Sequence, residues 1–164
     1  RWEACEFSPY FSRNIHFVYL NRKQNTQQSI ARYKDLVKNV ELKKSKIHQL
    51  NKITDKMLKC VDLKEYEDLV FEHENLISHA LDLPRVKDLL FSDYWGSVKS
   101  LGAWGGDFAM VTSDRSIEET KAYFSKLGYN DFLTFDDLIS QRPIKEQKLK
   151  IKSVDSIIAE QRTH

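Results

Sequence analysis

Apolar residues follow two periods along this chain, one typical of strands and one typical of helices. Residues 15–20 (Ile-His-Phe-Val-Tyr-Leu) form a dense run of β-branched, aromatic and aliphatic side chains, which predicts a buried strand. Two shorter runs, 97–101 and 108–112, flank a glycine-rich link and predict a hairpin. Residues 132–135 are expected to form the last strand.

Helical spacing fills the segments between these strands. Thr26 is a candidate N-cap for a first helix, and the spacing continues into a second helix around residues 47–57. Asp62 is expected to cap a third helix, which should end or break at Leu83-Pro84. A short helical piece at 86–90 follows. Ser116-Ile-Glu-Glu is a capping box for a helix that Gly128 should end.

The order of elements is therefore strand, several helices, two strands, one helix and one strand. This order predicts an α+β fold, a ferredoxin-like split βαβ arrangement with inserted helices. We expect an antiparallel sheet with its helices packed on one face. Residues 1–139 would form this domain. Residues 140–164 would form a polar, basic tail whose apolar residues have a weak helical spacing.

Composition indicates an ordinary globular protein. The chain has 164 residues, of which 41% are hydrophobic, and no apolar run approaches the roughly 20 residues needed to cross a bilayer. Cys5 and Cys60, far apart in sequence, are expected to be reduced thiols of a cytoplasmic protein. The histidines have no metal-ligand spacing, so no metal site is predicted. A start at Arg1 without an apolar signal core suggests a piece of a longer protein or a processed one.

Charge is unevenly distributed along the chain. Residues 21–64 carry twelve Lys and Arg against four Asp and Glu, and residues 65–139 carry six against fifteen. A basic stretch can form a nucleic-acid face, but no RNA-binding motif with interleaved aromatic residues accompanies this one. Two solvated helix surfaces are the favoured interpretation, and we expect only weak, non-specific nucleic-acid binding.

The glycine-rich link is the segment that carries candidate chemistry. Three of the five glycines lie within it, at 102, 105 and 106. Such a cluster allows either a tight turn or a loop whose N–H groups face an anion. It is neither a Walker A sequence nor a dinucleotide fingerprint, because it opens a strand instead of a helix.

Residues 98–109 (Val-Lys-Ser-Leu-Gly-Ala-Trp-Gly-Gly-Asp-Phe-Ala) resemble the third motif of the GHMP kinases. The positions that match that motif are Lys99, Gly102, Ala103, Gly105 and Gly106. Residues 66–83 resemble the helix that leads into the motif, with the matching pattern at 74–77 and 81–83, and residues 17–24 resemble the strand that opens the family's C-terminal half. The resemblance covers residues 15–139 and is nearest to the GYDIA-like subgroup and to mevalonate and phosphomevalonate kinases.

The resemblance implies an ATP- and Mg²⁺-dependent kinase that transfers the γ-phosphate to an alcohol or phosphate group of a small metabolite. Mevalonate or phosphomevalonate is the first candidate acceptor. The implied wall of the ATP and substrate site consists of Leu101, Gly102, Ala103, Trp104, Gly105, Gly106 and Asp107. Lys99, Gln24 and Thr26 would support it. No catalytic residue is expected in this chain, because the family's phosphate loop and catalytic aspartate belong to an N-terminal half.

Three departures from the motif bear on the role of the link. Leu101 replaces a threonine, and Trp104 and Asp107 stand where the wider family has glycines. A carboxylate near a phosphate is unfavourable unless a cation offsets it. The link could therefore contact phosphate, brace the phosphate loop or shape the acceptor pocket.

Two other classes of function stay open. The first is a non-catalytic ferredoxin-like module that binds a ligand or a protein. The second, less favoured, is a nucleic-acid-binding helical domain built on residues 21–64.

Overall fold

The structure, a computed structural model, describes residues 7–21, 40–102 and 107–139. Within these residues four strands form one antiparallel sheet in the order β2-β3-β1-β4. The strands are β1 (Ile15–Tyr19), β2 (Val98–Leu101), β3 (Phe108–Thr112) and β4 (Phe132–Thr134). The helices are α2 (Val40–Lys59), α3 (Leu63–Leu81), α4 (Val86–Leu90), α5 (Ile117–Lys126) and α6 (Phe135–Leu138), with a 3-10 turn, η1 (Ser12–Asn14). The predicted α+β class is confirmed.

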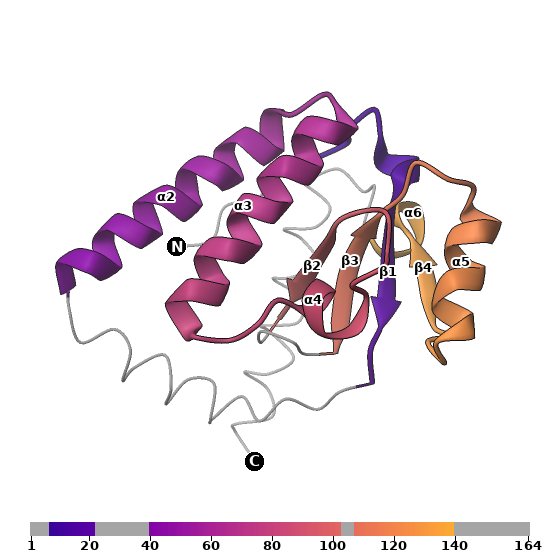
Figure 1. Cartoon of the computed structure of the whole chain (residues 1–164). Helices are drawn as coiled ribbons and strands as arrows, with labels where there is room; N and C mark the ends of the chain where they lie inside the picture. Colours follow the sequence, from indigo (N-terminus) through magenta and orange to yellow (C-terminus); the bar gives the residue numbers. More distant parts are fainter. Residues whose placement is uncertain (1–6, 22–39, 103–106, 140–164) are drawn as a thin grey trace, which may run out of the picture.

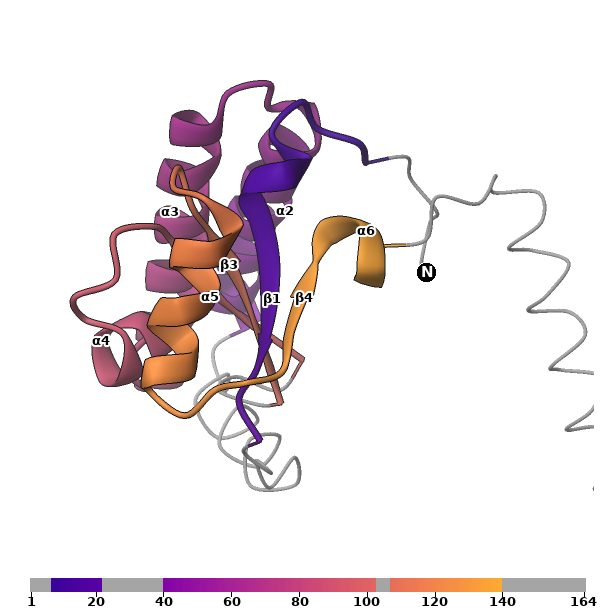
Figure 2. The ribbon, with the colours of Figure 1, turned by 90° about the vertical axis from the view of Figure 1, so that its right-hand side faces the viewer.

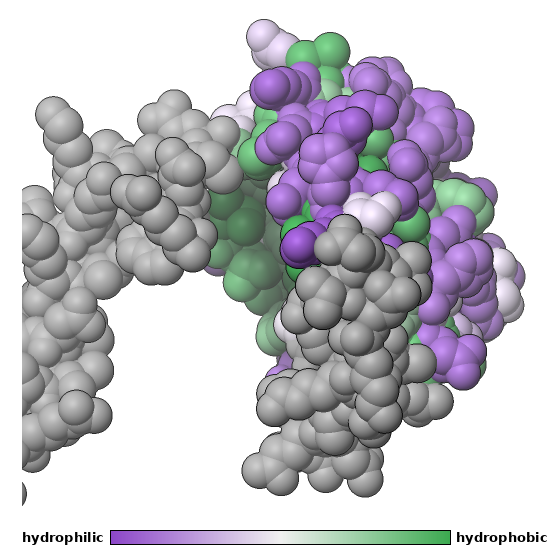
Figure 3. Space-filling view, turned by 90° about the vertical axis from the view of Figure 1, so that its left-hand side faces the viewer, coloured by the Kyte–Doolittle hydropathy of each residue, from purple (hydrophilic) through white to green (hydrophobic). Residues whose placement is uncertain are grey.

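Helices lie beside one edge of the sheet and on both of its sides. α2 and α3 form an antiparallel pair beside the β2 edge (Figure 1). α4 and α5 lie on one side of the sheet, and the short α6 lies on the other (Figure 2). Seen from α2 and α3, the surface is mostly hydrophilic, with hydrophobic side chains gathered in a hollow beside it (Figure 3).

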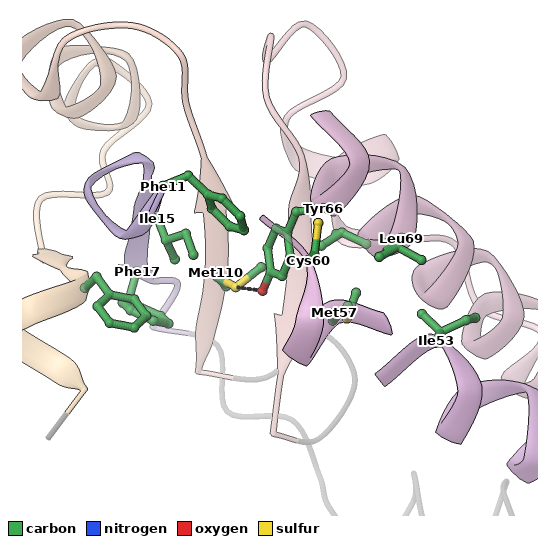
Figure 4. Close-up of a cluster of buried hydrophobic side chains, with 11 residues drawn as sticks. Phe11, Ile15, Phe17, Ile53, Met57, Cys60, Tyr66, Leu69 and Met110 are labelled. Carbon is green, nitrogen blue, oxygen red and sulfur yellow. Dashed lines mark hydrogen bonds between the residues drawn. The ribbon is translucent and has the colours of Figure 1, made fainter. Parts of the chain in front are cut away.

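Two apolar clusters occupy the two faces of the sheet. On one face Phe17 and Met110 pack with Tyr66 of α3 and with Met57 of α2 (Figure 4). On the other face the alternate strand residues pack against α4, α5 and the chain between α4 and β2. The members of this second cluster are Val18, Leu20, Val86, Phe91, Tyr94, Val98, Ala109, Val111 and Phe124.

The expectation that all helices would pack on one face is therefore wrong. β1 is buried at its first four positions and β3 at its last four. Strands that are apolar at almost every position need cover on both faces. The α2–α3 pair and α6 supply that cover on the face opposite α4 and α5.

Several helix ends lie where the sequence predicted them. The Asp62 side chain caps α3 by accepting the Glu65 N–H at 2.9 Å. Ser116 and Glu119 form the expected capping box of α5, and Gly128 follows that helix with a φ of 90°. α3 ends at Leu81, slightly before Leu83-Pro84, and its C-cap Asp82 has a φ of 50°.

The structure differs from prediction at the end of the last strand. Phe135 does not extend β4 but begins α6, because Thr134 and Asp137 form a second capping box. The helix predicted to begin at Thr26 and the tail 140–164 lie outside the described residues. No helix in the described parts combines the length and apolar character that a membrane span requires.

A glycine in the chain between α4 and β2 gives a test of the packing. A Cβ atom at Gly96 would overlap the backbone carbonyl of Thr112 in β3. Gly96→Ala should lower the free energy of unfolding by roughly 2–4 kcal/mol, because backbone must move to admit the methyl group. Urea unfolding measures the loss.

Gly102→Ala is the matched control for that measurement. Gly102 has a φ of 69°, but a Cβ there would meet nothing within 4 Å. The Gly102→Ala substitution should lower the free energy of unfolding only by the cost of an alanine in the left-handed conformation, on the order of 1–2 kcal/mol. Equal losses in the two variants would contradict the close approach at Gly96.

Tyr66 in the first cluster predicts a loss of stability at high pH. Its hydroxyl donates to the Met110 sulfur at 3.4 Å, and burial raises the pKa of Tyr66 to about 12. The unfolded chain ionises this group near pH 10, so its contribution is complete below pH 10 and is lost between 10 and 12. The slope is about 1.4 kcal/mol per pH unit. Tyr66→Phe should lower the slope by this amount in urea unfolding, whereas Tyr94, whose pKa burial also raises, keeps its own contribution. Tyr10→Phe, at a side chain 92% exposed, should leave the slope unchanged.

Candidate functional site

The glycine-rich link joins the ends of β2 and β3. Its first residue, Gly102, has a φ of 69°, a conformation that glycine adopts without penalty. At its other end the Asp107 carbonyl accepts the Leu20 N–H at 2.6 Å. The two described ends of the link are thus held by β2 and by the chain leaving β1.

Glu74 holds the strand that enters the link. β2 is an edge strand of the described sheet, so its outward N–H groups have no neighbouring strand to pair with. The Ser100 N–H donates instead to Glu74 Oε2 at 3.1 Å. Glu74 is only 1% exposed, and it reaches β2 from the buried side of α3.

Lys99 neutralises this buried carboxylate. Its ammonium lies 3.6 Å from Glu74 Oε1, with 20% of the Lys99 side chain exposed. It also donates to the Ser100 carbonyl at 3.4 Å. His73 Nδ1 lies 3.7 Å from the same Glu74 oxygen. A carboxylate buried this deeply needs such a partner, because an isolated buried charge is strongly unfavourable.

The environment of Lys99 affects its charge state. Burial lowers the pKa of Lys99, and the neighbouring Glu74 carboxylate partly counteracts that effect. The ammonium is engaged with Glu74 and with the Ser100 carbonyl. This geometry suits a residue that fixes the position of the link better than one that contacts a ligand directly.

Four of the predicted site residues fall within the described chain. Lys99, Leu101, Gly102 and Asp107 are brought together at the β2–β3 hairpin. Leu101 is partly buried and packs against the first apolar cluster. The other predicted site residues lie outside the described residues: Ala103, Trp104, Gly105, Gly106, Gln24 and Thr26.

Sequence reasoning did not select Glu74 as a site residue. A signal was present, because Glu74 follows Tyr66 and Val70 at successive four-residue steps of the apolar face of α3. A charged residue at a core position of a helix is a marker of a buried pair. The partner, Lys99, lies in a different element and could be identified only from the structure.

The basic stretch is only partly described. α2 carries exposed lysines at 52, 56 and 59 on its solvent side, while residues 22–39 lie outside the described chain. These exposed positions agree with a solvated helix surface, and nucleic-acid binding stays a prediction. Among the described residues no cluster of His, Cys, Asp and Glu could hold a metal ion.

Comparison of the chain with protein-family models gives no match, and comparison with curated proteins gives none either.

The buried pair makes a quantitative prediction. Glu74→Ala leaves the Ser100 N–H without its acceptor and Lys99 without its anion, so the free energy of unfolding should fall by roughly 3 kcal/mol. Glu74→Gln retains an acceptor and should cost less. Adding Lys99→Met to Glu74→Ala should recover part of the loss, since the unpaired cation is then removed.

The control uses an exposed ion pair on the same helix. Lys64 and Asp68 lie 3.2 Å apart with side chains 76% and 71% exposed. Asp68→Ala should change the free energy of unfolding by less than about 0.5 kcal/mol in the same urea titration. A Glu74→Ala loss as small as that of Asp68→Ala would show that the buried pair is unimportant.

Proposed function

We propose that this chain is the C-terminal half of a GHMP-type small-molecule kinase, cytoplasmic and dependent on ATP and Mg²⁺. The enzyme would transfer the γ-phosphate to an alcohol or phosphate group, with mevalonate or phosphomevalonate as first candidate acceptors. The observation that carries the proposal is the hairpin itself: the glycine-rich link follows an edge strand that the buried Glu74–Lys99 pair holds in place.

The connectivity of the sheet supports this proposal. The described elements follow the order strand, helices, strand, strand, helix, strand, and the four antiparallel strands are arranged β2-β3-β1-β4. The strand order and the antiparallel pairing are those expected of a ferredoxin-like split βαβ fold, which the resemblance to the GHMP kinases implies, whereas the α2–α3 pair and α5 on opposite faces of the sheet depart from it. We therefore propose that the α+β domain is of this type, with α2 as an inserted helix.

The chemistry of phosphoryl transfer gives the buried pair a role. Such transfer depends mainly on positioning and on stabilising charge at the γ-phosphate. The proposed task of Glu74 and Lys99 is to keep the link from shifting. Asp107 fits a bracing or acceptor-facing role better than direct phosphate contact, because its carboxylate is exposed and would repel phosphate oxygens.

The proposal predicts that this chain alone has no kinase activity. With ATP and Mg²⁺ it should not phosphorylate mevalonate, phosphomevalonate, homoserine or galactose. The full natural protein, including whatever precedes Arg1, should show turnover with one such acceptor. In that protein Gly105→Val should reduce kcat by roughly a hundredfold if the link lines the site, since small displacements near the γ-phosphate strongly affect rate.

Two comparisons make this experiment decisive. Gly128→Ala changes a positive-φ glycine after α5 and should lower the melting temperature without changing kcat. Trp104→Ala should raise KM for the acceptor and leave KM for ATP unchanged if Trp104 covers the acceptor. Wild-type kcat and both wild-type KM values in folded Gly105→Val and Trp104→Ala variants would make the link a structural turn.

A further inference from the structure

A pocket of about 340 Å³ opens at the opposite edge of the sheet from the glycine-rich link. Its walls come from η1, β1, the first turn of α5, the end of β4 and α6. Pockets of about this size and larger hold small metabolites in proteins. The buried pair and the link play no part in it, because β2 and β4 are the two opposite edge strands.

The pocket has one cationic and one anionic side chain at its rim. Arg13 from η1 and Asp136 from α6 both line it, and both are exposed. Neither forms an ion pair with the other or with a third group in the described chain. The neighbouring Asp137 is already engaged in the cap of α6, where it accepts from the Thr134 hydroxyl at 2.7 Å. Arg13 and Asp136 therefore present two opposite charges at the pocket.

The inner walls of the pocket are mainly apolar. Ile117 and Phe135 line it beside His16, and the His16 ring packs on Phe132 with centroids 4.9 Å apart. His16 is 2% exposed, and its Nδ1 has no hydrogen-bond partner in the described residues. Burial lowers the pKa of His16, so the imidazole is neutral near pH 7 and adds no charge to the pair at the rim.

We propose that this pocket binds a small zwitterion, an α-amino acid with an apolar side chain. The Arg13 guanidinium is suited to a carboxylate, which it can hold through two parallel hydrogen bonds. The Asp136 carboxylate pairs with the α-ammonium group. The apolar side chain of the ligand lies against Ile117 and Phe135.

The opposite charges at the rim select against other small ligands. A phosphate or a simple carboxylic acid is attracted by Arg13 and repelled by Asp136. A simple amine is attracted by Asp136 and repelled by Arg13. Only a ligand that carries both charges satisfies both side chains and still places an apolar group in the pocket.

Titration calorimetry on the whole chain tests the proposal with defined probes. L-phenylalanine and L-leucine should bind, whereas phenethylamine, which lacks the carboxylate, and 3-phenylpropionate, which lacks the ammonium, should each bind at least about tenfold more weakly. Absence of binding by both amino acids, or equal binding by the single-charge analogues, would overturn it.

Paired variants assign the binding to this pocket. Arg13→Gln and Asp136→Asn should each weaken amino-acid binding by about tenfold or more. Arg115→Gln and Asp114→Asn alter exposed charges outside the pocket lining and should leave it unchanged. Equal weakening by both pairs would contradict the assignment. The measurement needs no catalysis, so its outcome is independent of the proposed kinase function.

Discussion

The contact between Glu74 and the Ser100 N–H links the helical pair to the sheet. It brings a carboxylate into the core, and that carboxylate in turn requires the ammonium of Lys99. In many proteins the outward N–H groups of an edge strand are exposed to water. Here one of them is hydrogen-bonded to the carboxylate of a charge pair. The arrangement also blocks the addition of a foreign strand at this position, because the N–H that such a strand would need is already occupied.

A second polar network fixes the other end of α3 to the sheet. The Thr112 hydroxyl donates to Glu67 Oε1 at 2.6 Å and accepts the Ser97 N–H at 2.8 Å. The Thr112 carbonyl accepts the Tyr94 hydroxyl at 2.7 Å. α3 is thus joined to the strands at two acidic residues about two turns apart, and its angle to β2 is set by hydrogen bonds as well as by apolar contacts.

The sequence predicted those features that depend on local chemistry. The capping box at Ser116, the cap at Asp62 and the strand at 108–112 follow from neighbouring residues. Features that depend on distant partners were not predicted. Gly96 is required by the carbonyl of Thr112, and the pocket between η1 and α6 depends on chain segments more than a hundred residues apart. The short α6 was missed because Phe135 continues an apolar run, although Thr134 and Asp137 carried a capping signal.

The strand order also has a consequence for synthesis of the protein on the ribosome. β1 is made before the other strands, yet its partners are β3 and β4, with Ile15 paired to Thr112 and Phe17 to Leu133. Its buried, apolar residues therefore leave the exit tunnel long before any strand that can cover them. The nascent chain must carry this exposed segment until residue 134 has emerged, and this is the interval in which a chaperone would protect it from aggregation.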